Sequence, residues 1–426
     1  MLRFRTAASR ARAATALVLS VLFAVGCGGG DEAADSALGP QQLRVRWVPP
    51  HLYPPSPDHY VLQLQAALTP AQIQLLQSQF GLSVVTSQSY EGDEITLLNG
   101  PVGVNLADVE GQLSGTVIET SVNDAVSLVE GTTLIGSFAV GEWSTEAASG
   151  TGLESLNAEL LHESVRGAGV IVAVLDTGAD LDHPHLVDNV SPLPASSGLF
   201  SSEQLDGDDD DGDGLVDEAY GHGTHVTGIV CQIAPDVTVI PVRVLNADGV
   251  GSIWDLMRGL LVAAEHGAQI FNLSLATTEP NDMLETRFQT MSEAGLVVIA
   301  AAGNGGNGSP TFPGSSAFTV GVAAVDAQDL LTSFSGSGPL VAMAAPGVNV
   351  LSTYPSVGDQ VNGARATGTS MAAPSVCGSL ALLMEGLSTS GPFCVSVLKS
   401  TASTVYPSGS VVFGRVNPVQ SLGTAR

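Results

Sequence analysis

The sequence predicts an α/β protein, in which a three-layer domain with a mostly parallel sheet follows a small α+β domain. Three observations support this prediction. Beyond residue 150, short apolar strands alternate with helical patterns, as in a parallel sheet covered on both faces. Residues 170–175 form an unbroken apolar run, which is typical of a central strand. With 426 residues, 44% of them hydrophobic, the chain can bury one large core and a second smaller one.

The first 27 residues have the pattern of an export signal. Arginines near the start precede an apolar run, residues 13–25, that is too short to span a membrane. The run ends in Ala24-Val25-Gly26-Cys27, which resembles a bacterial lipobox and would make Cys27 a lipidated first residue. An ordinary signal peptide cleaved after small residues is the alternative. In either case we expect an exported protein, either secreted or attached to the cell envelope by a lipid on Cys27.

The next part of the chain reads as a small domain between two linkers. Thr69-Pro70 supplies a helix N-cap and a first-turn proline, and Gly81 is placed as a C-cap. With a second helical pattern at 106–113 and four strand-like segments, the order is βαββαβ, that of a ferredoxin-like domain. The expected segments are a signal, a linker, the small domain, a linker with a processing region, and the α/β domain: residues 1–27, 28–56, 57–130, 131–150 and 151–426.

Charge and cysteine content exclude several classes of protein. The formal charge of -28 gives a surface that repels phosphate backbones, so we expect no nucleic-acid partner. The four cysteines are Cys27, Cys231, Cys377 and Cys394. Without Cys27 they allow one disulfide at most, and the sequence leaves its pairing open. The chain is therefore not a disulfide-built scaffold.

Three motifs carry residues suited to nucleophilic catalysis. Asp176 ends the apolar strand in Asp-Thr-Gly, His222 stands in Gly-His-Gly-Thr-His, and Ser370 begins an apolar helix in Gly-Thr-Ser-Met-Ala-Ala-Pro. A serine hydroxyl needs a base to remove its proton, and the base needs an orienting carboxylate. Taken singly, these residues could be a turn aspartate, a structural histidine and a helix N-cap. Together, in the order Asp, His, Ser, they indicate a catalytic triad.

Two other hydrolase classes fit less well. Aspartic peptidases also use Asp-Thr-Gly, but they need two such loops. This sequence has only a single Asp-Thr-Gly. No Gly-x-Ser-x-Gly motif surrounds Ser370, which argues against an α/β-hydrolase esterase.

The three motifs closely resemble the signatures of subtilisin-like serine peptidases, and the resemblance extends from about residue 150 to the C-terminus. The preceding βαββαβ unit is similar to the inhibitory propeptide of that family. The resemblance implies a secreted, monomeric serine endopeptidase that acts on proteins or peptides and is processed by itself from a precursor. It leaves open whether the specificity is broad or confined to one target. The rival from another class is a catalytically silent, calcium-binding surface protein on a peptidase scaffold.

The resemblance also assigns residues to the oxyanion hole and the substrate cleft. Asn304 would donate its side-chain amide to the oxyanion beside the backbone N–H of Ser370. An extended substrate would add as a strand between two edges, and Ala276 stands on one of them where the family usually has Gly. The pocket for the residue before the cleaved bond would have Thr311 at its floor and would favour apolar residues of moderate size. The substrate-binding residues expected are Gly249, Val250, Gly251, Leu273, Ser274, Leu275, Ala302, Gly303 and Thr311.

An acidic loop precedes His222. Asp209, Asp211, Asp213 and Asp217 fit the pattern Asp-x-Asp-x-Asp-Gly-x-x-Asp, in which alternate carboxylates converge on a hard cation. A solvated acidic surface is the alternative. Because aspartates so close together repel one another without a cation, we expect structural calcium here.

Overall fold

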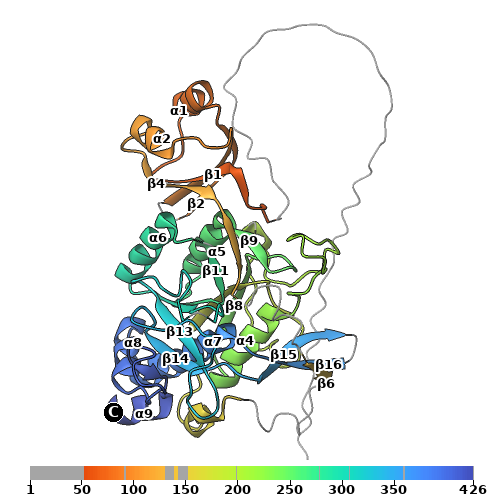
Figure 1. Cartoon of the computed structure of the whole chain (residues 1–426), viewed down its shortest axis with the longest axis vertical. Helices are drawn as coiled ribbons and strands as arrows, with labels where there is room; N and C mark the ends of the chain where they lie inside the picture. The colour runs from red at the N-terminus through yellow and green to blue at the C-terminus, as the bar shows by residue number, and fades with distance from the viewer. Residues whose placement is uncertain are drawn as a thin grey trace, which may run out of the picture. The chain divides into compact units, whose positions relative to one another are not determined.

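The computed structural model describes residues 52–90, 93–129, 139–142, 152–197, 199–277, 279–306, 308–357 and 360–425 (Figure 1). These residues belong to one compact unit, which runs from Val48 to Arg426. The expected export signal, Cys27 and most of the first linker lie outside the described residues.

A seven-stranded sheet lies at the centre of the large domain, and all neighbouring strands in it are parallel. The predicted apolar run forms one of its inner strands, β7. In spatial order the strands are β17 (Gly414–Arg415), β14 (Met343–Pro346), β13 (Val320–Val325), β12 (Val297–Ala301), β10 (Ile270–Leu273), β7 (Ile171–Asp176) and β8 (Thr238–Arg243).

Helices cover both faces of this sheet, so the three-layer α/β prediction is confirmed. Alternate side chains of β7 show the two faces: Val172 and Val174 pack in one hydrophobic cluster, and Ala173 and Leu175 in the other. One cluster contains residues from α4 (His222–Ile233), α7 (Thr369–Leu387), α8 (Gly391–Ser400) and α9 (Pro418–Ala425). The other contains residues from α5 (Ile253–Glu265) and α6 (Asp282–Glu293).

Among the described residues, α7 is the one helix long and apolar enough to cross a membrane. Because 83% of its most apolar window is buried inside the protein, its composition is accounted for by its place in the core.

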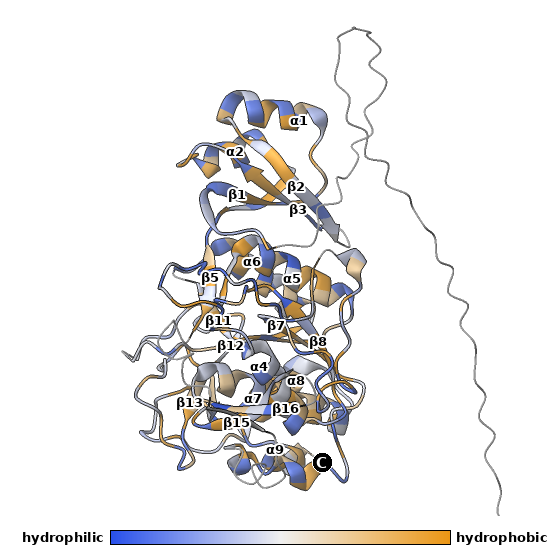
Figure 2. Ribbon diagram, turned by 90° about the vertical axis from the view of Figure 1, so that its right-hand side faces the viewer, coloured by the Kyte–Doolittle hydropathy of each residue, from blue (hydrophilic) through white to orange (hydrophobic). Residues whose placement is uncertain are grey.

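The small N-terminal domain has the predicted order of elements. Its antiparallel sheet has the order β2-β3-β1-β4, and its helices mix hydrophobic and hydrophilic residues along their length (Figure 2). Thr69 caps the first helix, Pro70–Leu75, through a capping box, and Gly81 at φ 70° ends the π-helical segment Leu76–Phe80 that continues it. The elements are β1 (Ser56–Leu64), α1 (Pro70–Leu75), η1 (Leu76–Phe80), β2 (Ser83–Tyr90), β3 (Asp93–Asn99), α2 (Leu106–Gln112) and β4 (Val117–Asn123).

Two short strands lie where the sequence analysis placed none. β5 (Ala125–Leu128) pairs with β9 (Val250–Ser252) on one side and with β11 (Leu275–Thr277) on the other. β6 (Ala139–Glu142), within the expected linker, pairs with β16 (Gln360–Ala366), which itself pairs with β15 (Val350–Val357). The end of the range expected for the small domain and part of the expected linker therefore add strands to the large domain.

Candidate active site

Asp176 and His222 form a buried pair at one end of the central sheet. Asp176 is the last residue of β7 and His222 the first of α4, and His222 Nδ1 lies 2.7 Å from Asp176 Oδ1. The same Oδ1 accepts the N–H of Thr177 at 2.8 Å. Gly223 permits this close approach, because a Cβ there would lie 2.1 Å from the carbonyl oxygen of Gly178. The carboxylate is thus placed to hold the imidazole in one orientation.

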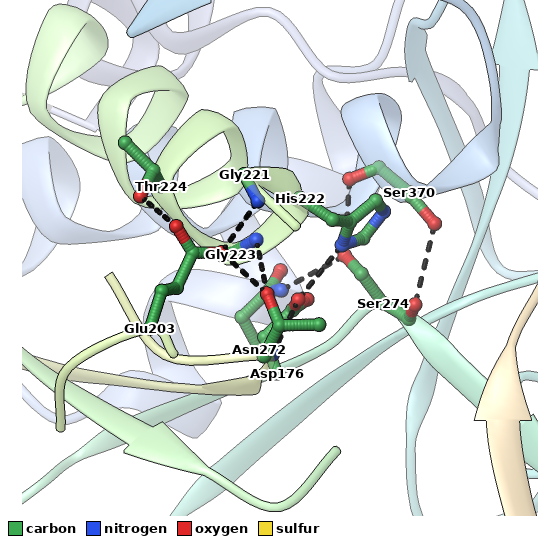
Figure 3. A network of polar contacts seen from close by, with 10 residues as sticks. Asp176, Glu203, Gly221, His222, Gly223, Thr224, Asn272, Ser274 and Ser370 are labelled. Carbon is green, nitrogen blue, oxygen red and sulfur yellow. Dashed lines mark hydrogen bonds and ion pairs between the residues drawn. The ribbon is translucent and has the colours of Figure 1, made fainter. Parts of the chain in front are cut away.

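Ser370 is the second residue of α7 and is fully buried in this structure. Its Oγ donates to the carbonyl oxygen of Ser274 at 3.3 Å, and its own carbonyl accepts the Ser274 hydroxyl at 3.0 Å. Asn272 on β10 donates to that hydroxyl at 3.0 Å. Figure 3 draws Asp176, His222 and Ser370 within the same group of polar contacts. Residues far apart in the sequence therefore bring a carboxylate, an imidazole and a hydroxyl to one site.

Asn304 follows β12 and is held against the start of α7. Its Oδ1 accepts the N–H and the hydroxyl of Thr369, at 2.9 and 3.0 Å. The Thr369 hydroxyl also accepts the N–H of Gly303 at 3.1 Å. Because the amide oxygen is fixed toward Thr369, the Nδ2 group of Asn304 is turned away from that residue. The amide is thus oriented beside the helix turn that carries Ser370.

His225, the second histidine of the Gly-His-Gly-Thr-His motif, has a different environment from His222. Burial lowers the pKa of His225 to about 3, so its imidazole is neutral at ordinary pH. Its Nε2 lies within hydrogen-bond distance of the Val350 and Ala364 carbonyl oxygens. These contacts give His225 a role in packing α4 against β15 and β16.

The chain's own β5 fills the space between the two expected substrate edges. Ser127 lies opposite Val250 on β9 and opposite Ala276 on β11, and the N–H of Leu128 donates to the carbonyl of Gly249 at 3.0 Å. The sequence does not predict this strand, because four residues of mixed polarity after a predicted strand give no separate signal. Gly249–Gly251 and Leu275 are thus paired with an extended segment of the chain itself.

The substrate edge predicted for Leu273–Leu275 begins later in the chain than predicted. Leu273 belongs to β10 and is fully buried in the core, so its side chain faces α5 and α6 rather than the cleft. The paired edge begins at Leu275. The cause is a break between the two strands at Ser274, whose side chain turns to Ser370.

Three of the residues expected around the pocket, Ala302, Gly303 and Thr311, lie together. The N–H of Thr311 donates to the carbonyl of Ala302 at 2.9 Å. Gly303 has φ 94°, and a Cβ on it would lie 2.6 Å from Thr311 Oγ1. Thr311 therefore packs directly against the segment that leads into Asn304.

The acidic loop brings three of its four predicted aspartates together. Ligand atoms of Asp209, Asp211 and Asp213 lie within 4.8 Å of one another and are exposed. Asp217 is not in this cluster. Its carboxylate accepts the N–H groups of Asp206 and Gly207 at 3.1 Å each and so ties the two ends of the loop together. Three converging carboxylates are the hard oxygen donors that calcium prefers.

The structure answers the open question about disulfides for the described cysteines. Cys231, Cys377 and Cys394 are free and buried. Burial raises the pKa of Cys231 to about 12, so this thiol is unreactive at ordinary pH.

Comparisons with known proteins show the family of this chain. Residues 167–404 match the subtilase family. Thermitase from Thermoactinomyces vulgaris is 32% identical over 284 residues, which cover 64% of this chain and 95% of thermitase. Subtilisin Savinase from Lederbergia lenta is 34% identical over 277 residues, 62% of this chain and 96% of the relative. An intracellular serine protease of Paenibacillus polymyxa is 33% identical over 251 residues, 55% of this chain and 72% of that protein. The family match covers more than half of the chain, which therefore belongs to the subtilase family of serine endopeptidases.

Proposed function

We propose that the protein cleaves peptide bonds with Ser370 as the nucleophile, His222 as the general base and Asp176 as the residue that orients His222. The 2.7 Å contact between His222 Nδ1 and Asp176 Oδ1 carries this proposal, because it leaves Nε2 as the ring atom that can accept a proton. Ser370 Oγ attacks the substrate carbonyl while His222 takes its proton. His222 then gives that proton to the leaving amine. Water, activated by the same imidazole, hydrolyses the acyl-enzyme.

The negative charge that develops on the substrate oxygen needs fixed donors. We assign this role to the Nδ2 group of Asn304 and the backbone N–H of Ser370, near the N-terminus of the 19-residue helix α7. Support comes from the two hydrogen bonds that fix Asn304 Oδ1 on Thr369.

We propose that the enzyme cuts its own precursor and that the small N-terminal domain is its intramolecular inhibitor. β5 supports this, because it lies in the cleft as an extended strand joined directly to that domain. Contacts between the small domain and the helices also support it. Arg287 on α6 pairs with Asp93 at 2.9 Å, and Arg258 on α5 donates to Gln88 at 2.9 Å.

The strand register indicates which bond is cut. Val126, Ser127 and Leu128 lie opposite Thr277, Ala276 and Leu275 in turn, so continuing the antiparallel register brings Val129 opposite Ser274. The carbonyl of Ser274 accepts the Ser370 hydroxyl, so Val129 is the residue nearest the nucleophile along the strand. We therefore propose cleavage on the carboxyl side of Val129. The substrates implied are extended peptides with branched aliphatic residues, which suits a pocket with Thr311 against Gly303.

N-terminal mapping of the processed enzyme by mass spectrometry tests this proposal. The full-length chain, purified from a protease-deficient host, is expected to yield a mature N-terminus at Glu130, and the Ser370→Ala variant is expected to remain intact. A Ser370-dependent cut at another bond would disprove the register assignment alone. Processing that persists without Ser370 would disprove self-cleavage itself.

We propose that Asp209, Asp211 and Asp213 bind a structural calcium ion, supported by the convergence of their carboxylates. Added calcium should raise the melting temperature, because a ligand that binds only the folded state stabilises it by about 2.7 kcal/mol at one hundred times its Kd. Combining Asp211→Asn with Asp213→Asn should remove most of this response. Asp188→Asn, an exposed acid outside the loop, is the control. Equal melting temperatures in calcium and in chelator would leave only an acidic surface.

We further propose that the protein is exported, since its first 27 residues have the pattern of a signal sequence. Fractionation of cells that express the wild type or Cys27→Ser checks this and the lipid anchor together. A lipidated wild type should be found with membranes, and the variant should be released from them.

A further inference from the structure

A carboxyl group that the proposed chemistry does not use lies beside the Asp176–His222 pair. Glu203 precedes α4 in the sequence, and in Figure 3 it lies on the side of His222 away from Ser370. Its Oε1 accepts the Thr177 hydroxyl at 2.6 Å and the Gly221 N–H at 3.0 Å, and its Oε2 accepts the Thr224 hydroxyl. One side chain therefore joins the residue after Asp176 to residues on both sides of His222.

The two threonines extend these contacts to the backbone. Thr177 Oγ1 accepts the N–H of Gly223 at 3.0 Å, and Thr224 Oγ1 accepts the N–H of Asp180 at 2.8 Å. Each hydroxyl has one proton, which it donates to Glu203, and its lone pairs remain for these amides. The carboxyl group thus sets the direction of both hydroxyls. Through them it fixes the start of α4 relative to the end of β7.

The helix that carries His222 depends on this arrangement, because it has no cap of its own. Its N-cap residue is Gly221 at φ 94°, and no side-chain cap bond is made there. The first amides of a helix need acceptors from elsewhere, and Glu203 and Thr177 supply two of them. A negative charge at a helix N-terminus is also stabilised by the helix dipole.

We infer that Glu203 is a positioning residue for the proposed triad. It holds His222 in place relative to Asp176, and it adds a negative charge on the side of His222 away from Ser370. This inference rests on the proposed function, since the triad gives the positioning its purpose. The charge favours the imidazolium that forms when Ser370 loses its proton. A neutral acid loses both this charge and one of its acceptor sites, because one oxygen then carries a proton.

The environment of Glu203 makes this contribution pH-dependent. Burial raises the pKa of Glu203 to about 7, opposed by its hydrogen bonds from Thr177 and Thr224 and reinforced by the charge of Asp176. The other titratable groups that interact with it are Tyr220, before α4, and Tyr354, on β15. Because folding raises this pKa, the group contributes stability at low pH that is lost as the pH rises through 7. The ionised form therefore supports activity at some cost to stability.

Kinetics of three variants test the inference. Glu203→Gln keeps the shape and one acceptor oxygen without the charge, and Glu203→Ala removes both. The control is Glu385→Gln, because Glu385 also accepts three backbone N–H groups, those of Arg166, Gly167 and Ala168, near the far end of α7 from Ser370. Active sites are counted with a fluorophosphonate, so that kcat refers to folded enzyme only.

For Glu203→Ala we expect kcat per active site to fall about tenfold or more, with KM nearly unchanged. For Glu203→Gln we expect kcat close to the wild type at pH 6 and several-fold lower at pH 8.5, without a lower melting temperature at pH 8.5. If the carboxyl group had a structural role alone, the ratio of the wild-type kcat to the Glu203→Gln kcat would be constant with pH. Such a constant ratio, or wild-type kcat in Glu203→Ala, would overturn the inference. Activity that survives Ser370→Ala would instead overturn the proposed triad.

Discussion

The Ser370→Ala variant is expected to lose peptidase activity and to accumulate as the uncut chain. In the structure the Ser370 hydroxyl is held by the carbonyl of Ser274, the residue between β10 and β11. No other described group is assigned the role of nucleophile, so the loss in kcat should be about 10⁶-fold, the size found when a triad serine is removed. The loss in kcat is measured by the hydrolysis of a peptide in which the sequence of residues 125–129 precedes the cleaved bond.

A matched control separates chemistry from folding. Ser375 is buried in the same helix, and its hydroxyl donates to the carbonyl of Met371 at 3.2 Å. Ser375→Ala should therefore change stability slightly and leave kcat near the wild type. An active Ser370→Ala enzyme, free of contaminating protease, would contradict the proposed mechanism.

The Asn304→Ala variant is expected to lower kcat by about 10²- to 10³-fold with little change in KM. The oxyanion exists only in the transition state, so loss of a donor to it leaves ground-state binding intact. Steady-state kinetics on the same peptide measure both constants. Replacing the amide also removes the acceptor of the Thr369 N–H and hydroxyl, so a small loss of stability should accompany the effect.

Asn281→Ala is a suitable control for this variant. Asn281 caps α6 by accepting the N–H of Leu284, and its amide donates to Ser121 at 2.8 Å, away from Ser370. We expect it to lower the melting temperature and not kcat. If Asn304→Ala retains wild-type kcat, Asn304 is not part of the oxyanion hole.

The predictable parts of this protein are those written in local sequence patterns. An unbroken apolar run predicted β7, and Thr69-Pro70 with Gly81 predicted the first helix and its end. Asp176, His222 and Ser370 were found because each stands at the end of a strand or the start of a helix, with glycines beside it. Such patterns depend on a few neighbouring residues, so a single sequence contains them.

The parts that the sequence did not predict depend on contacts between distant segments. β5 is a strand only because β9 and β11 supply its partners. Asp217 fits the spacing of a calcium ligand, yet it lies outside the cluster of Asp209, Asp211 and Asp213. Glu203 lies in an irregular loop, and nothing in the sequence around it indicates that Thr177, Gly221 and Thr224 converge on its carboxyl group.

Mapping of a fluorophosphonate adduct shows whether this subtilase is an active peptidase and whether Ser370 is its nucleophile. The full-length chain is allowed to process itself, is treated with the probe, and is digested for mass spectrometry. We predict one adduct, on the Ser370 hydroxyl, with much slower labelling in His222→Ala because the base that activates the serine is lost. A correctly folded protein that takes no label would indicate a catalytically silent subtilase scaffold. A label on another serine would show that Ser370 is not the nucleophile.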